Sequence, residues 1–222
     1  MDSPQKNWNK RQTQFREILL SFNQHDQAIR LFLHQHAALH TAQMASTGTW
    51  SFEDEVLNDM QEEQIRRIPQ NCEHSVAWAI WHIARIEDTT MNMLVAGGPQ
   101  ILFSEEWFDK LEVEARDTGN AMSDEGVAAL SSSINIEMLK SYRMAVGRRT
   151  REVVKQLSPS DLSHKVEPAR LQQILDDGAV VAEDQGLIDY WSKRNIAGLL
   201  LMPATRHNFV HLNEAQKLKK RR

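Results

Sequence analysis

The chain has 222 residues, 41% of them hydrophobic and 25% charged, which is enough for one domain with a substantial core. Its net charge of -4 provides no general attraction to nucleic acid or membranes, and the one strongly basic run, 217–222, is typical of a solvated helix end. The single cysteine, Cys72, excludes an intrachain disulfide, and no signal peptide or membrane span is visible. We therefore expect a cytoplasmic protein with one domain over residues 1–222.

The N-terminal third of the chain predicts two helices. Apolar residues recur at intervals of three and four over residues 10–45, so we expect one long helix that ends at the polar segment 46–49. Ser51 follows as a candidate N-cap. A shorter helix is expected over residues 52–67, and Pro69 stops it.

Three further long helices are predicted downstream. The first begins after Ser75 and ends before Gly97, and the second spans about 123–157. The last spans about 183–216 and contains Pro203, whose ring should kink or break the helix one turn before His207. Such a kink would either aim the following side chains inward or begin a separate helical segment.

The predicted fold class is all-α, because no alternating β-branched run bounded by turn residues appears. Four long helices and shorter helical insertions favour a four-helix bundle. The segment 97–122 is longer than a tight antiparallel turn needs and can cross the length of a bundle. The expected topology is therefore up-down-down-up, which places the start of the second long helix beside the end of the last.

Nine histidines supply the candidate functional residues. Two pairs lie four residues apart, His36 with His40 and His207 with His211, and this spacing puts both rings on one helix face. His82 lies among apolar neighbours, where the alternative is a core histidine bonded to a carbonyl or a side chain. The expected topology brings His82 to His207 and His211. We therefore predict one divalent-metal site formed by these three residues, with a position open to water or substrate.

Several other chemistries are excluded by the sequence. No Glu precedes any histidine by three residues, so the ligand pairs of di-iron bundles are missing, and no phosphate-binding glycine loop or nucleophile elbow occurs. Cys72 is interpreted as a structural thiol rather than a nucleophile. We interpret His36 and His40 as neighbours of the site or as polar packing, with direct ligation as the alternative. Further groups are candidates for the pocket or for solvated helix charges: Arg85, Glu87, Tyr142, Arg206 and Glu214.

The segment 75–88 around His82, followed by His207-x-x-x-His211 on the last helix, resembles the DinB/YfiT-like superfamily. The order of the helices is similar over most of the chain, and the segments 103–120 and 162–182 look like insertions. The resemblance implies a four-helix bundle with a long crossover between its second and third helices. It also implies a bound divalent ion, commonly nickel or zinc, with His82 as the first ligand and His207 and His211 as the second and third.

What the resemblance implies about activity is broad. Characterised members include thiol S-transferases that use bacillithiol or glutathione and a mycothiol-dependent maleylpyruvate isomerase, and many others have no known activity. Many members have a His-Arg-Gly-Gln segment after the last ligand, where this chain has Leu212, Asn213 and Glu214. That difference does not affect the three ligands, but it means that the resemblance does not assign the chain to the thiol-transferase subfamily.

The leading functional hypothesis is a metal-dependent enzyme that acts on a small molecule, as a thiol S-transferase or a hydrolase. A bound divalent ion either lowers the pKa of water to about 7 or deprotonates a thiol, so a low-molecular-weight thiol is one expected substrate. The alternative is a non-catalytic, stress-associated bundle protein that binds a metal or a small ligand, with a homodimer as one possible assembly. Nucleic-acid binding through the basic run 217–222 is the least favoured hypothesis.

Overall fold

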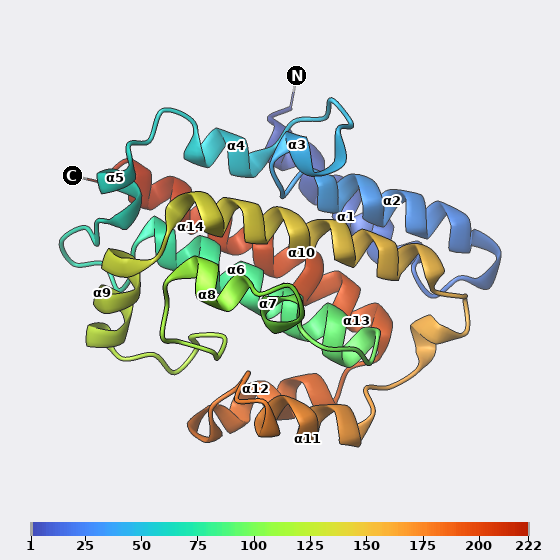
Figure 1. Cartoon of the computed structure of the whole chain (residues 1–222). Coiled ribbons are helices and arrows are strands. Elements are labelled where there is room, and N and C mark those ends of the chain that lie inside the picture. Colours follow the sequence, from blue (N-terminus) through green and yellow to red (C-terminus); the bar gives the residue numbers. More distant parts are fainter. Residues whose placement is uncertain (1, 222) are drawn as a thin grey trace.

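In a computed structural model, the described residues 2–221 form helices joined by turns and loops (Figure 1). Within that range the β pairing consists of one isolated antiparallel bridge between Lys165 and Asn195. The predicted all-α class is therefore confirmed. Among the described helices, none is both long enough and apolar enough to cross a membrane.

The prediction of a single long helix over residues 10–45 is wrong. The chain forms α1 (Pro4–Ile18), a short 3₁₀ turn and α2 (His25–Ala37) in its place. The two helices are antiparallel, because the Trp8 indole donates to the Gln35 carbonyl (3.0 Å) and the Gln35 amide donates to the Trp8 carbonyl (2.8 Å). The apolar periodicity continues through the turn because both helices bury a face, so periodicity alone did not reveal the break.

The next predicted helix also divides. Ser51 is the expected N-cap, since its hydroxyl accepts from the backbone N–H three residues later at 3.0 Å. It begins α4 (Phe52–Leu57), and α5 (Glu62–Arg66) follows after Asp59, whose φ of 63° interrupts the helix. A single helical turn, α3 (Ala42–Ala45), precedes both.

The second long helix was correctly predicted. It comprises α6 (Val76–Asp88), capped by the Ser75 hydroxyl, and continues into the π-helical segment η2 (Thr89–Val95). Every residue from Val76 to Val95 is buried. The helix ends at Gly97, whose φ of 69° is left-handed.

The connection after this helix contains two short helices, α7 (Ile101–Ser104) and α8 (Trp107–Leu111). The third predicted helix is then split into α9 (Asp124–Ser133) and α10 (Ile136–Gln156). Asn135 separates them because its side chain accepts from the backbone N–H three residues later at 3.2 Å and caps α10.

The last predicted helix is likewise segmented. A 3₁₀ turn (Asp161–Ser163) and α11 (Pro168–Asp176) lie in the preceding insertion, and a second 3₁₀ turn (Ala182–Asp184) leads into the predicted region. That region consists of the following elements: α12 (Gln185–Ser192), α13 (Ile196–Leu201), the π-helical segment η5 (Met202–His207) and α14 (Asn208–Lys219). Asn195 caps α13 by accepting from the Gly198 N–H at 2.9 Å.

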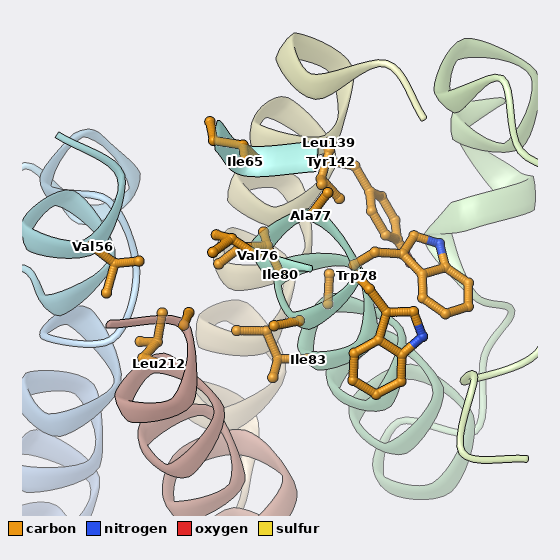
Figure 2. Close-up of a cluster of buried hydrophobic side chains, with 14 of the residues drawn as sticks. Val56, Ile65, Val76, Ala77, Trp78, Ile80, Ile83, Leu139, Tyr142 and Leu212 are labelled. Carbon is orange, nitrogen blue, oxygen red and sulfur yellow. The ribbon is translucent and has the colours of Figure 1, made fainter. Parts of the chain in front are cut away.

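Helix α6 lies at the centre of the molecule, with α10 and α14 packed along it and α2 packed on α10 (Figure 1). Ile80 and Ile83 of α6 lie among apolar side chains from neighbouring elements, including Val56 of α4 and Leu212 of α14 (Figure 2). This arrangement places the side chains of α6 next to those of α14, which is what positions the candidate site.

Candidate metal centre

Three imidazoles that are far apart in sequence meet between α6 and α14. His82 lies at the middle of α6, His207 ends η5, and His211 lies one turn into α14. His82 Nε2 is 3.2 Å from His207 Nε2, and the ring centres of His207 and His211 are 4.4 Å apart. One nitrogen of each ring lies within 4.8 Å of the others. The structure thus brings together the three residues that the sequence singled out.

The orientation of His82 is fixed by the backbone. Its Nδ1 lies 2.6 Å from the carbonyl oxygen of Thr118, and a carbonyl only accepts, so Nδ1 carries the proton. The Nε2 lone pair therefore faces His207. Burial, followed by the nearby His211, lowers the pKa of His82 to about 3 and keeps the ring neutral. A neutral ring with its second nitrogen bonded to a carbonyl is the usual state of a metal-binding histidine.

The other two rings differ in their surroundings. His207 is partly exposed as a residue, but its Nδ1 is buried, and burial of the ring, with His82 and His211 beside it, holds the pKa of His207 well below its usual value. Glu214 Oε2 approaches His211 Nδ1 to 2.6 Å, as a close contact rather than an aligned hydrogen bond. The His211 imidazole lowers the pKa of Glu214, so this carboxylate is negative beside the cluster.

The spacing of His82 and His207 fits a small divalent ion. Metal–nitrogen bonds of ~2.0–2.1 Å in a tetrahedron place two ligand nitrogens ~3.3 Å apart. The separation of 3.2 Å between His82 Nε2 and His207 Nε2 is close to that value. Three neutral imidazoles leave the charge of such an ion uncompensated, which favours an anionic fourth ligand.

The segment η5 shows why Pro203 does not end the helix. Pro203 has no N–H to donate, and the chain widens into a π turn over Met202–His207. The Thr205 hydroxyl lies 2.8 Å from the carbonyl of Leu200, and the Gln12 amide of α1 donates to Thr205 Oγ1 at 2.8 Å. Of the predicted kink or break, the break does not occur: the chain stays helical through the proline, but the α-helix is interrupted by this π segment.

Thr118 was not singled out by the sequence analysis. It lies in the segment 103–120, which looked like an insertion, yet its carbonyl orients His82. Its own N–H donates to the carbonyl of Ala179 in the other insertion at 2.9 Å. Arg85 supports the same loop by donating to the Arg116 carbonyl at 2.7 Å. The one local sign in the sequence that this loop has a constrained backbone was Gly119, whose φ is 81°.

Gly119→Ala is expected to disturb the centre through this loop. A Cβ at Gly119 would lie 2.6 Å from Cζ3 of Trp81, so the loop or the indole must move. We expect a loss of stability of about 1–3 kcal/mol and a metal affinity about tenfold weaker, measured by chemical denaturation and chelator competition. Gly48→Ala is the control, because Gly48 has a similar φ of 63° and nothing within 4 Å of the added carbon. Equal effects of the two substitutions on metal affinity would contradict the role of the loop.

A second polar cluster is centred on Glu87 of α6. His36 Nε2 lies 2.8 Å from Glu87 Oε1, and His40 Nε2 lies 3.1 Å from Glu87 Oε2. Thr150 of α10 donates to Oε1 and Asn208 of α14 donates to Oε2, both at 2.7 Å. All five residues are fully buried. His36 and His40 are therefore polar packing around Glu87, one of the two interpretations favoured by the sequence.

The Glu87 cluster fits a hydrogen-bond network better than a metal site, although His36, His40 and Glu87 are close enough to share an ion. A carboxylate has about four acceptor positions, and four donors already surround this one. Among the described residues, Nδ1 of neither histidine has a hydrogen-bond partner, whereas a metal-bound imidazole normally donates its second N–H. Burial opposes ionisation of Glu87, but His40 and His36 outweigh it and hold the pKa of Glu87 well below its usual value.

The remaining candidate residues lie away from the three rings. Arg85 and Tyr142 both bond Asp88, with Tyr142 Oη 2.7 Å and Arg85 Nη1 3.3 Å from Asp88 Oδ2. Arg206 donates to the side chain of Asn9 on α1 at 2.6 Å. These groups stabilise the fold around the centre, and Glu214 is the one of the five that touches a predicted ligand.

Comparison with known proteins agrees with this geometry. The sequence profile of the DinB superfamily matches residues 48–215, which is well over half of the chain and includes all three histidines. No curated protein matches the sequence.

Proposed function

The chain belongs to the DinB superfamily, and we propose that it is a divalent-metal-dependent enzyme that acts on a small molecule through His82, His207 and His211. The observation that carries this proposal is the convergence of three imidazole rings, with His82 Nε2 3.2 Å from His207 Nε2. Nickel and zinc are the proposed metals, because imidazole nitrogens suit both ions.

The residues of the chain have distinct tasks in this proposal. When bound, the ion supplies a Lewis acid that makes water or a thiol nucleophilic near neutral pH. Thr118 holds His82 in the tautomer whose Nε2 is free to bind, and His207 and His211 present their rings from the adjacent helix. Trp78 stacks between His74 and His82, with ring centres 4.6 and 4.7 Å apart, and covers one side of the centre.

Metal analysis tests the first part of the proposal. Protein purified without an affinity tag and exposed to nickel or zinc is expected to retain about one equivalent of metal per chain, since one three-histidine site is present. Binding should raise the midpoint of thermal unfolding, because a ligand at 100 times its Kd stabilises the folded state by about 2.7 kcal/mol. Retention of no metal and an unchanged midpoint would contradict the proposal.

Two assays of the metal-loaded protein distinguish the proposed reaction types. Transfer of a low-molecular-weight thiol, such as glutathione, to an electrophile would identify a thiol S-transferase, and hydrolysis of ester or amide substrates would identify a hydrolase. Either reaction should stop when the metal is removed by a chelator. Loss of activity on chelation that returns with added metal is the expected result.

Glu214 favours the second candidate function, a non-catalytic protein that binds a metal or small ligand. Its carboxylate lies 2.6 Å from a ring nitrogen of His211, and in this alternative it turns toward the ion and becomes the fourth ligand. Substitution with Co²⁺ distinguishes the two functions, since its visible spectrum responds to an added thiol when a position is open. An unresponsive spectrum in the unaltered chain that becomes responsive in Glu214→Ala would favour the closed, non-catalytic site.

We also propose that the whole chain is one domain built on an up-down-down-up bundle of α2, α6, α10 and α14. Two hydrogen bonds support antiparallel packing of α2 and α10. Arg151, in the second half of α10, donates to the Leu33 carbonyl of α2, and Arg143, in its first half, donates to the Leu39 carbonyl just after α2. The Glu87–Thr150 and Asp88–Tyr142 bonds join α6 to α10. The long connection between those two helices supports the crossover that this topology requires.

A further inference from the structure

Glu87 accepts hydrogen bonds from three other parts of the bundle. Its two oxygens accept from His36 of α2, from His40 in the turn after α2, and from one residue each of α10 and α14, at distances of 2.7–3.1 Å. Glu87 is itself on α6 and fully buried. A buried carboxylate with this many donors is held in one place, because moving it would leave several polar groups without partners.

Asn208 connects this carboxylate to the proposed metal centre. It is the first residue of α14 and directly follows His207, and its Nδ2 donates to Glu87 Oε2 at 2.7 Å. Asn208 is fully buried, so the bond is not in competition with solvent.

The position of this bond along the helix matters. The π segment Met202–His207 comes just before Asn208, so the regular ladder that would set the rotation of α14 is interrupted there. Gln12 holds the π segment on one side through Thr205. The Glu87–Asn208 bond holds the following turn on another side, one residue from His207 and three from His211.

We propose that the Glu87–Asn208 hydrogen bond sets the rotation of α14 so that His207 and His211 face His82, which makes Glu87 and Asn208 positioning residues of the metal centre. This inference rests on the proposed function. Metal sites tolerate displacements of only about 0.5 Å or 10–20°, and loss of a partner that orients a ligand commonly weakens metal binding by about 10–100-fold.

Thr150 provides a matched comparison for Asn208. Both side chains are fully buried, and both donate to Glu87 at 2.7 Å, but Thr150 lies on α10, away from the ligands. Asn208→Leu and Thr150→Val each remove one such hydrogen bond with little change of size. If the bond to Glu87 contributed only to general stability, the two variants would have similar metal affinities. If Asn208 positions α14, metal affinity should fall in the Asn208 variant and not in the Thr150 variant.

The experiment compares the two variants in the untagged full chain. Zinc affinity by chelator competition is expected to fall about 10–100-fold in Asn208→Leu and less than about threefold in Thr150→Val. The visible bands of bound Co²⁺ should shift in Asn208→Leu alone. Circular dichroism and urea denaturation of the metal-free proteins establish that each variant is folded. If Asn208→Leu does not fold, Asn208→Ala takes its place in the comparison.

Three results would overturn the positioning role. Equal zinc affinities in the Asn208 and Thr150 variants would do so while leaving the proposed function intact. Two metal equivalents per chain, reduced to one by His36→Ala, would make Glu87 a ligand instead of a positioning residue. Absence of metal binding by the unaltered chain would remove both this inference and the proposed function on which it rests.

Discussion

His82→Ala is expected to abolish stable metal binding, lowering the metal content from about one equivalent per chain to a trace. The substitution removes one of three ligands, so the affinity should fall by more than the ~100-fold upper range for loss of an orienting partner. His82 is the one ligand on α6, and without it His207 and His211 are two rings on a single helix. Metal analysis after dialysis, together with thermal unfolding with and without zinc, measures the effect.

Two other histidine variants control for this result. His164 has a side chain that is 68% exposed, so His164→Ala should retain metal at the level of the unaltered chain. His74 lies near the centre, with its ring stacked on Trp78, but it is not a predicted ligand. If His74→Ala retains its metal, the loss of metal in His82→Ala is due to a missing ligand and not to a change in the surroundings of the centre. Similar metal contents in His82→Ala and the unaltered chain would show that the ion binds elsewhere.

Glu87→Ala is expected to destabilise the metal-free protein by about 3–5 kcal/mol, a large effect that is typical of breaking a buried hydrogen-bond network. The loss follows because four buried donors, from His36, His40, Thr150 and Asn208, would no longer have an acceptor. Urea denaturation in the presence of a chelator measures the free energy of unfolding without a contribution from bound metal.

Glu137→Ala is the matched control for this prediction. Glu137 also lies on a helix and pairs with Lys140, but its side chain is 75% exposed, so its removal should change stability by no more than about 0.5 kcal/mol. Glu87→Gln should fall between the two, because glutamine keeps one acceptor oxygen. A stability loss in Glu87→Ala as small as that in Glu137→Ala would mean that the network contributes little to the fold.

Local signals in the sequence determined the helical class and several helix boundaries. Ser51 and Ser75 were recognisable as caps because capping involves a backbone N–H only three residues away. The pair His207 and His211 was recognisable for a similar reason, since four residues are one helical turn. His82 required a further step, a topology inferred from the length of the segment 97–122, and the structure places its ring beside the other two.

Tertiary structure decided what those local signals could not. The turn between α1 and α2 was invisible because apolar periodicity is the same for one long helix and for two that bury the same kind of face. The roles of Thr118 and Glu87 depend on partners 36 and 51 residues away, at His82 and His36. Such contacts exist only once the helices pack, because a buried polar group must take whatever partner the fold brings to it.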